Sequence, residues 1–346
     1  MVKLRMTKKQ KQLSKNYVKR LVVVKLATPE EMTVSKATRA AYGVTLAELA
    51  QEGVKVVAVD ADLTGSTTTK TFAQASPENK GRLFNVGIAE QNMIDVAAGL
   101  ALAGNVAFTG SFAVFGTGRA YDQIRNTVAY SNLNVKIAPT HAGISVGPDG
   151  GSHQMLEDIS LMRGLPHMRV FVPADYSAAC AALKIAAKTP GPAYIRMGRA
   201  AGPAVYSADV ELEEGKAYVL REGSDATIIA CGVEIAEANK AAVQLAEEGI
   251  SVEVIDAFSI KPLDSETILA SLSKTGCGVV AEEHSVYGGL GSAVSELCAQ
   301  SLPVPLELVG VRDTFGKSGE FGELMSYFHL DAPALVQAVK KVLGRK

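Results

Sequence analysis

The chain has 346 residues, 47% of them hydrophobic, and a formal net charge of −1 at pH 7. This length and apolar content allow two domains with separate buried cores, which excludes a fibrous or a disordered protein. The four cysteines lie inside apolar runs without a CxxC pair or nearby paired histidines, so neither a disulfide framework nor a zinc site is expected, and a cytoplasmic location follows.

Basic residues are concentrated at the amino end. Residues 1–25 contain nine Lys or Arg and no acid, which leaves a net charge of −10 over the rest of the chain. The only apolar run there, 21–24, is too short for a signal peptide, and no later stretch is long enough to span a bilayer. We therefore expect a soluble protein in which residues 1–27 form a solvated basic extension. An arm that binds nucleic acid is the alternative.

Helical and strand patterns alternate after this extension. A helical pattern runs over 33–52, with Thr33 or Ser35 as N-cap and Gly53 as its stop, and a β-branched run follows at 54–59. The alternation continues as helix 90–103, strand 105–109, helix 119–130, strand 134–138, helix 154–163, strand 168–172, helix 175–188 and strand 193–197. Such alternation favours a parallel sheet with helices on both faces.

Residues 201–216 lose this periodicity and collect Gly, Pro and acids, as in a linker between domains. A second alternating block follows, with strands at 226–231, 251–258, 277–283 and 306–311 and helices at 234–247, 264–273, 291–301 and 332–343. The predicted fold is therefore α/β, with two doubly wound domains of largely parallel sheet at 28–200 and 217–346.

One acid stands where a strand-like stretch meets an apolar helix. In GIAEQNM (87–93), Glu90 is the only acid between Glu78 and Asp95. A carboxylate at this junction can share a proton with a ring nitrogen of a ligand. An acid in a first helical turn also complements the helix dipole, so the catalytic interpretation of Glu90 has a structural alternative.

Two aromatic residues follow the next strand. Phe112 and Phe115, in SFAVFGTGRAYDQIRN (111–126), border a Gly-rich stretch that we expect to leave their rings facing open space. Such a pair can form a stacking platform for a planar heteroaromatic ligand, or it can simply fill a core.

A third segment, THAGISVGPDGGSHQMLED (140–158), places His141, Asp149 and His153 in a loop of small residues. The glycines and the proline around them cannot supply apolar walls, so the segment predicts a polar site. Metal binding is the rival interpretation, but the gap of twelve between the histidines matches no compact zinc pattern. The glycines favour a loop that bends around a small polyol.

These three segments and VAEEHSVYGGLGSAVSE (280–296), taken in order, resemble the pyrimidine-binding and C-terminal domains of transketolases. The resemblance covers roughly residues 33–340. It implies a thiamine-diphosphate-binding fold of the pyrimidine type followed by a transketolase C-terminal-like domain. It also implies transfer of a two-carbon ketol unit from a ketose phosphate to an aldose phosphate, as in the pentose phosphate pathway.

By this resemblance, Glu90 matches the family glutamate that binds N1′ of the cofactor's pyrimidine and promotes the imino form of its amino group. Phe112 and Phe115 match the aromatic pocket for that ring, and Asp62 matches an aspartate near the cofactor. Many relatives place a third aromatic residue near Gly118. This chain does not, so that wall is expected to be thinner or to come from another ring, Tyr121.

The resemblance also assigns residues to the sugar phosphate. His153 matches a histidine that hydrogen-bonds oxygens at the reacting carbons and can shuttle protons, and Asp149 matches an aspartate that binds the adjacent hydroxyl. Four further residues match positions that hold the phosphate dianion, a ligand that suits guanidinium groups: Arg39, Ser66, His141 and Arg199.

A missing motif points to a partner. Transketolases hold the diphosphate through a metal and a GDG motif followed some 25–30 residues later by asparagine, all in an N-terminal domain. No such pattern occurs here, and the PDGG at 148–151 lies in the histidine segment. The resemblance therefore implies an N-terminal subunit that carries the GDG…N motif and most of the Mg²⁺ or other divalent-cation site. The assembly is expected to be at least a heterotetramer.

Three alternatives remain open at this stage. The β subunit of a 2-oxo acid dehydrogenase E1 component has the same two domains, but it has little use for four phosphate-binding residues. A 1-deoxyxylulose-phosphate-synthase-like subunit normally carries its diphosphate domain on the same chain. An inactive paralogue that only binds a partner has no reason to keep Glu90 and His153. The glycine run at 287–291 could bind an anion, although a simple turn is the favoured interpretation.

Overall fold

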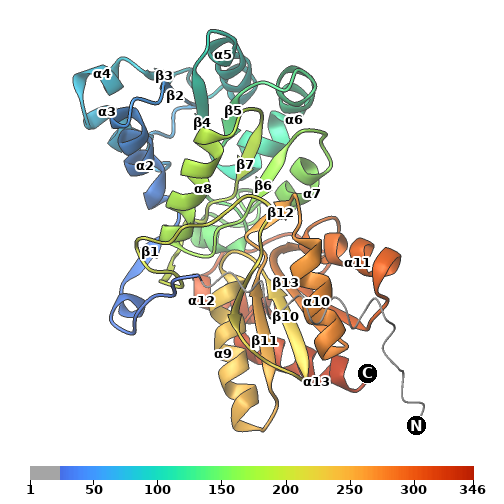
Figure 1. Cartoon of the computed structure of the whole chain (residues 1–346). Coiled ribbons are helices and arrows are strands. Elements are labelled where there is room, and N and C mark those ends of the chain that lie inside the picture. Colours follow the sequence, from blue (N-terminus) through green and yellow to red (C-terminus); the bar gives the residue numbers. More distant parts are fainter. Residues whose placement is uncertain (1–23) are drawn as a thin grey trace.

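The computed structural model describes residues 24–346, so most of the predicted basic extension lies outside the described residues. Figure 1 shows two α/β units, one built on strands β2 to β7 and the other on strands that include β10, β11 and β13. Leu26 bridges to Tyr206, and Ala27 N donates to Val205 O, so the first described residues run beside the segment between the units. In the described part of the chain no helix is both long and apolar enough to cross a membrane.

A seven-stranded sheet with the order β12-β6-β7-β5-β4-β2-β3 forms the first unit. Neighbouring strands are parallel except at the edge, where β12 pairs antiparallel with β6. Because β12 comes from the second half of the chain, the two units share a sheet edge. The strands are β2 (Val56–Asp60), β3 (Leu83–Asn85), β4 (Val106–Gly110), β5 (Val135–Ile137), β6 (Arg169–Phe171), β7 (Ala193–Ile195) and β12 (Ser259–Lys261).

Helices cover both faces of this sheet, and alternate strand residues separate the two cores. In β2, Val56 and Ala58 pack with Leu46 of one helix, whereas Val57 and Val59 belong to the opposite core. The α-helices are α2 (Ala40–Gln51), α3 (Thr69–Gln74), α4 (Pro77–Lys80), α5 (Glu90–Leu102), α6 (Tyr121–Gln123), α7 (Asp158–Arg163) and α8 (Tyr176–Lys188), joined by the 3₁₀ turns η1 (Glu31–Thr33) and η4 (Ile144–Asp149) and the π-helical segments η2 (Val114–Arg119) and η3 (Ile124–Ala129).

The second unit is a five-stranded sheet with the order β14-β13-β10-β11-β9, parallel except for the edge strand β9. The predicted fold class, two doubly wound units with largely parallel sheets, is confirmed. The elements are β9 (Tyr218–Arg221), β10 (Ala226–Ala230), α9 (Glu234–Glu247), β11 (Val252–Asp256), α10 (Ser265–Thr275), β13 (Gly278–Ser285), α11 (Leu290–Ser301), β14 (Leu306–Val311), α12 (Phe321–Tyr327) and α13 (Ala332–Leu343).

The predicted helix over 33–52 is wrong over its first third. Residues 35–37 form strand β1 (Ser35–Ala37), which pairs antiparallel with β8 (Ala201–Pro203) inside the predicted linker, and α2 begins only at Ala40. The helix predicted over 119–130 is instead broken into η2, α6 and η3. The helix predicted over 154–163 begins at Asp158, because Met155 forms a β-bridge with Ala142 and residues 156–157 bend away from it.

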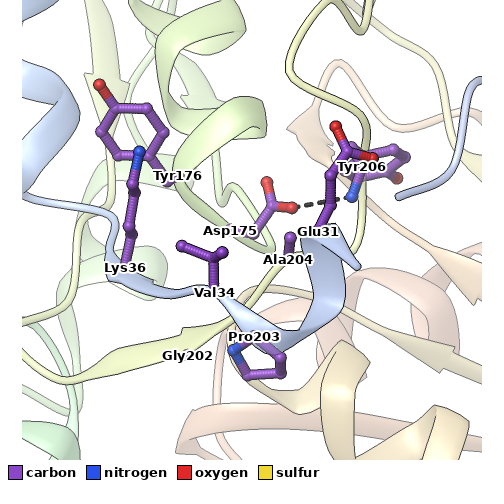
Figure 2. Close-up of a pocket in the computed structure, with 9 residues that line it drawn as sticks. All are labelled: Glu31, Val34, Lys36, Asp175, Tyr176, Gly202, Pro203, Ala204 and Tyr206. Carbon is purple, nitrogen blue, oxygen red and sulfur yellow. Dashed lines mark hydrogen bonds between the residues drawn. The ribbon is translucent and has the colours of Figure 1, made fainter. Parts of the chain in front are cut away.

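A pocket of about 170 Å³ lies between β1 and the start of α8. Figure 2 shows Val34, Lys36 and Tyr176 on its wall, and the Lys36 ammonium lies 4.7 Å from the Tyr176 ring centroid. None of the residues predicted to bind cofactor or substrate lines this pocket.

Lys136 is a fully buried cation in the middle of β5. Its ammonium donates to the carbonyl oxygens of Thr189 at 2.8 Å and Gly191 at 2.6 Å, which ties the sheet to the turn after α8. Burial, together with a smaller contribution from the charge of Arg169, lowers the pKa of Lys136 to about 7.

We expect this lysine to make stability depend on pH. Between about pH 7 and the ordinary lysine pKa, the unfolded chain binds a proton that the folded chain has released, so the free energy of unfolding rises with pH. That rise should be roughly 2–3 kcal/mol from pH 7 to 9.5, and Lys136→Met should remove it. Urea unfolding at both pH values checks this, with exposed Lys55→Met as the control. An unchanged pH dependence in Lys136→Met would contradict a lowered pKa.

Candidate active site

Glu90 is the first residue of α5, and its side chain is only 3% exposed. The chain turns from β3 into this helix at Gly87, which has a φ of 74° that glycine adopts without strain. The Glu90 Oε2 accepts a hydrogen bond from Arg119 Nη1 at 3.1 Å. The residue is therefore a buried carboxylate at a helix start, held by one cation.

Arg119 is a site residue that the sequence patterns did not single out. Its guanidinium carbon lies 4.6 Å from the Phe115 ring centroid, and its side chain is half exposed. It follows Gly118, near which the resemblance implied a third aromatic residue that this chain lacks, and Tyr121 packs against the buried core instead. An arginine next to the position of the missing aromatic residue was the one sequence feature that could have pointed to this role. The contact between the two side chains indicates that Arg119 covers Phe115 in place of a third ring.

Four aromatic rings meet beside this pair. The Phe112 ring stacks on His141 with centroids 3.8 Å apart, and Phe115 meets His153 edge-on at 5.3 Å. The two phenylalanines lie nearly parallel with their centroids 6.3 Å apart. The structure thus brings the two predicted aromatic residues and both predicted histidines together. It differs from the expectation for Phe112, which is buried under His141 rather than facing open space.

His141 is almost fully buried, and its backbone has a φ of 62°, which is uncommon for a residue with a side chain. Its Nδ1 lies 2.7 Å from the hydroxyl of Thr140. Burial lowers the pKa of His141 to about 3, and the nearby charges of Arg39, Arg199 and His153 act in the same direction. The imidazole is therefore neutral at physiological pH, among groups of positive charge.

Two guanidinium groups complete this positive cluster. Arg39 Nη1 donates to the backbone oxygen of Ser66 at 2.9 Å, and Arg199 Nη1 donates to the backbone oxygen of Val146 at 3.0 Å. Burial lowers the pKa of Arg39, and the charge of Arg199 lowers it further. Within residues 24–346, neither guanidinium is paired with a carboxylate. Two such cations beside a neutral histidine favour an anionic ligand.

The loop after β2 carries two predicted residues, Asp62 and Ser66, to different environments. Buried Asp60 accepts hydrogen bonds from the hydroxyls of Thr67 and Thr69, which fixes the loop. Ser66 reaches the cluster through its backbone oxygen, as described above. Asp62 is exposed, has a φ of 64°, and accepts from Asn85 Nδ2 at 3.1 Å, so no other predicted site residue is among its hydrogen-bond partners in the described part of the chain.

Residues 140–155, called the histidine loop below, fold into compact turns. Residues 144–149 form the 3₁₀ turn η4, and exposed Asp149 is its last residue. The PDGG at 148–151 begins in the last residues of this turn and continues just beyond it. It opens no helix of its own and therefore does not have the form of a diphosphate-binding motif. His153 is partly buried, and its Nδ1 lies 2.9 Å from the Ser152 hydroxyl.

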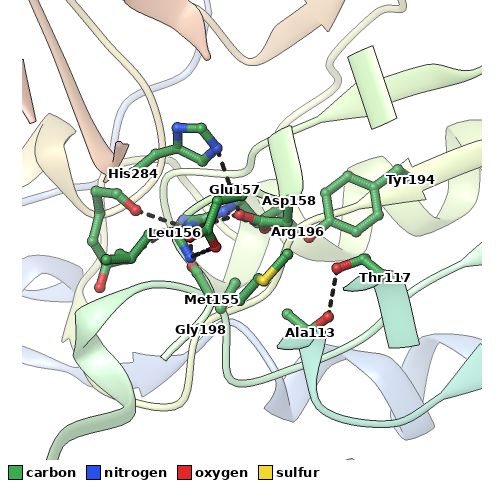
Figure 3. A network of polar contacts seen from close by, with 12 residues as sticks. Ala113, Thr117, Met155, Leu156, Glu157, Asp158, Tyr194, Arg196, Gly198 and His284 are labelled. Atoms are coloured by element: carbon green, nitrogen blue, oxygen red, sulfur yellow. Dashed lines mark hydrogen bonds and ion pairs between the residues drawn. The ribbon is translucent and has the colours of Figure 1, made fainter. Parts of the chain in front are cut away.

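A buried ionic network lies where the two units meet, as Figure 3 shows. Arg196, which follows β7, donates from Nε to Asp158 Oδ2 at 2.7 Å, and its Nη1 lies 3.5 Å from Oε2 of Glu283 at the end of β13. Tyr194 also donates to Asp158. Burial opposes ionisation of Asp158, but the Arg196 charge outweighs it and holds the pKa of the carboxyl below its ordinary value. The network joins the units through charged side chains.

The glycine run at 287–291 does not offer a free anion site. Helix α11 begins at Leu290, and the backbone N–H groups of Leu290 and Gly291 donate to the Glu282 carboxylate at 2.7 and 2.8 Å. An acid of the same chain thus occupies the position that an anion would take. Over residues 24–346, no group of three or more His, Cys, Asp or Glu is arranged to hold a metal ion.

Comparison with known proteins gives this site a context. Residues 34–204 match the transketolase pyrimidine-binding domain, and residues 215–335 match the transketolase C-terminal domain. A putative transketolase C-terminal section from Methanocaldococcus jannaschii is 45% identical over 90% of this chain and 98% of that protein. The chain belongs to the transketolase family.

Two further members of the transketolase family resemble the chain over nearly their whole lengths. A subunit of a 6-deoxy-6-sulfo-D-fructose transketolase from Clostridium sp. (strain MSTE9) is 44% identical over 89% of this chain and 95% of that subunit. A solved split-gene transketolase, described as an inactive β4 tetramer, superposes with a TM-score of 0.82. It is 49% identical, and the match covers 90% of this chain and 99% of the other. The site residues described above all lie in the pyrimidine-binding domain.

Proposed function

We propose that this chain is the C-terminal subunit of a two-subunit transketolase that depends on thiamine diphosphate. It would transfer a two-carbon ketol unit from a ketose phosphate to an aldose phosphate. The observation that carries the proposal is the convergence of two unpaired guanidinium groups and a neutral histidine next to a buried glutamate and two aromatic rings.

The residues around Glu90 fit the pyrimidine half of the cofactor. In the structure, the planar guanidinium of Arg119 donates a hydrogen bond to Glu90 and lies over the Phe115 ring. A protonated aminopyrimidine makes contacts of the same two kinds. Glu90 would hold a proton at its ring nitrogen, and Phe112 and Phe115 would stack against it. When bound, thiamine diphosphate supplies the electron sink that cleavage of a carbon–carbon bond beside a carbonyl requires. Asp62, on the loop after β2, would lie near the cofactor.

The histidine loop would hold the reacting end of the sugar. His153 is edge-on to Phe115 and partly exposed, so it would be able to take or return a proton at a substrate hydroxyl. Exposed Asp149 would accept a hydrogen bond from the adjacent hydroxyl. His141 is neutral, so it would serve as a hydrogen-bonding group rather than as a charge.

The phosphate would be held by Arg39, Arg199, His141 and the Ser66 region. Each guanidinium donates one N–H to a backbone oxygen and has further N–H groups that can donate to a ligand. This cluster favours a sugar phosphate over the 2-oxo acids used by E1-type enzymes, since a 2-oxo acid carries a carboxylate but no phosphate dianion for these four residues to bind.

A second polypeptide would complete the site. The chain has no GDG motif for the cofactor's diphosphate, so an N-terminal subunit would supply that motif and most of the site for Mg²⁺ or another divalent cation. The similar split-gene protein is described as inactive when it is a β4 tetramer, which supports the need for a partner. The assembly we propose is a cytoplasmic heterotetramer.

The substrate class can be tested in the complex assembled with the N-terminal subunit, thiamine diphosphate and Mg²⁺. We expect two-carbon transfer between a ketose phosphate and an aldose phosphate, measured by chromatography of both products. We expect no decarboxylation of a 2-oxo acid in the presence of an artificial electron acceptor. Turnover of the 2-oxo acid without ketol transfer would favour the E1-type alternative, and failure of both reactions in a folded complex would favour the inactive paralogue.

A further inference from the structure

The histidine loop closes on itself at its base. Gly143 N donates to Met155 O at 2.9 Å, and Gln154 Nε2 donates to Ile144 O at 3.1 Å. Ile144 and Val146 are fully buried, and Arg199 Nη1 donates to Val146 O at 3.0 Å, so the first unit holds part of the loop. Further hydrogen bonds come from the C-terminal domain, which contributes none of the predicted cofactor or substrate residues.

One attachment from that domain is the carboxylate of Glu283, near the end of β13 and 3% exposed. Its Oε1 accepts a hydrogen bond from the backbone N–H of Ser145 at 2.5 Å. A second attachment lies nearby, because Gln154 Nε2 also donates to Lys317 O at 2.9 Å. Both bonds connect the loop that carries His141 and His153 to the other domain.

The approach of Glu283 depends on the absence of a side chain at Gly143. A Cβ on Gly143 would lie 2.3 Å from the carboxyl carbon of Glu283, and Gly143 also has a φ of 76°. Both the lack of space and the positive φ therefore favour glycine at position 143. The absence of a side chain at Gly143 and the positive φ of its backbone thus both allow the loop to contact the Glu283 carboxylate.

The guanidinium of Arg196 lies next to the carboxylate of Glu283. Burial raises the pKa of Glu283 above its ordinary value, although the Arg196 guanidinium at 3.5 Å and the Ser145 N–H act in the opposite direction. Arg196 is itself held by Asp158 through two contacts and donates from Nη2 to the Glu283 backbone oxygen at 2.8 Å. The carboxylate is thus fixed from both sides, which makes it a rigid support for the loop.

We propose that Glu283 of the C-terminal domain is a positioning residue for the histidine loop, and that through this loop it sets the affinity for the phosphorylated substrate. The first part concerns the loop alone. The second part rests on the function proposed above, because it requires that His141 and Arg199 bind a sugar phosphate. Arg199 is included because its Nη1 donates to Val146 O, one residue beyond the Ser145 contact.

Hydrogen–deuterium exchange on the full chain tests the first part. Glu283→Ala should speed exchange of the peptide spanning 142–155 by about tenfold or more, because it removes the acceptor of a buried N–H. Glu283→Gln keeps an oxygen at that place and should give a smaller increase. The matched control is the neighbouring Glu282→Gln, which should loosen the peptide at 288–297 and leave 142–155 protected. Unchanged protection of 142–155 in both folded Glu283 variants overturns the proposal.

Steady-state kinetics of the complex with the N-terminal subunit tests the second part. The KM for a ketose phosphate should rise about tenfold in Glu283→Ala and less in Glu283→Gln, with kcat falling less than KM rises. The KM for an unphosphorylated ketose should rise less, because that donor uses Asp149 and His153 of the loop but not the phosphate contacts of His141 and Arg199. Glu282→Gln should leave both values near those of the natural chain. Faster loop exchange with an unchanged KM for the phosphorylated donor overturns the claim on affinity. The exchange measurement needs no substrate, so it decides the positioning role independently of the proposed function.

Discussion

Glu90→Gln should lower the rate of C2 proton exchange in bound thiamine diphosphate by a factor on the order of 10²–10⁴. The amide keeps the size and shape of the carboxylate and still accepts the hydrogen bond from Arg119, so cofactor binding should change little. What it loses is the negative charge that holds a proton at the pyrimidine nitrogen. Deuterium incorporation at C2, followed by NMR in the complex with the N-terminal subunit, measures this rate directly.

The control for this variant separates catalysis from helix stability. Glu78 is also an acid in the first turn of a helix, α4, but it is exposed. Each Glu→Gln change removes about 0.3–1 kcal/mol of helix-dipole stabilisation, and Glu90→Gln also replaces the ion pair with half-exposed Arg119 by a hydrogen bond to a neutral oxygen. Both variants should therefore remain folded in thermal unfolding. Near-normal exchange in a folded, cofactor-bound Glu90→Gln complex would show that the residue is only a helix-start acid.

Arg199→Ala and Arg39→Ala should each raise the KM for phosphorylated sugars by about one to two orders of magnitude. Each change removes a charge-assisted contact worth roughly 1.5–3 kcal/mol, and neither cation has a carboxylate partner among residues 24–346 that would be left unpaired. For a small unphosphorylated donor the KM should change far less. Initial rates over a range of concentrations of both donors give the comparison.

Arg125→Ala is the control for a general loss of positive charge. Its guanidinium is exposed and donates to Asn126 rather than to the cluster, so both KM values should stay near those of the natural chain. An equal increase for the phosphorylated and the unphosphorylated donor in Arg199→Ala would count against a phosphate site.

Local sequence patterns predicted the elements that carry Glu90 well. The helix expected over 90–103 is α5 at Glu90–Leu102, and the next strand, expected at 105–109, is β4 at Val106–Gly110. Here the hydrophobic period and the glycine stop agree with the tertiary structure. By contrast, β1 forms because Ser35 pairs with Pro203, far along the chain. A pairing between such distant segments leaves no trace in local periodicity.

The residues of the site also fall into two groups, those that the sequence could predict and those that depend on tertiary contacts. Resemblance named the two phenylalanines and both histidines, which the structure brings into ring contact. It could not indicate that Arg119 joins Glu90 to Phe115, because that contact depends on how the π-helical segment η2 turns its last residue. Nor could it indicate that Glu283 reaches Ser145, because this contact exists only when the two domains pack together.

The central claim is that this chain holds half of a divided active site, and a mixing titration tests it most directly. The purified chain, with thiamine diphosphate, Mg²⁺ and both sugar phosphates, is titrated with an N-terminal subunit that carries the GDG…N motif, and ketol transfer is measured at each ratio. We predict no transfer by either subunit alone and activity that saturates at an equimolar ratio. Full turnover by this chain without a partner would contradict the claim.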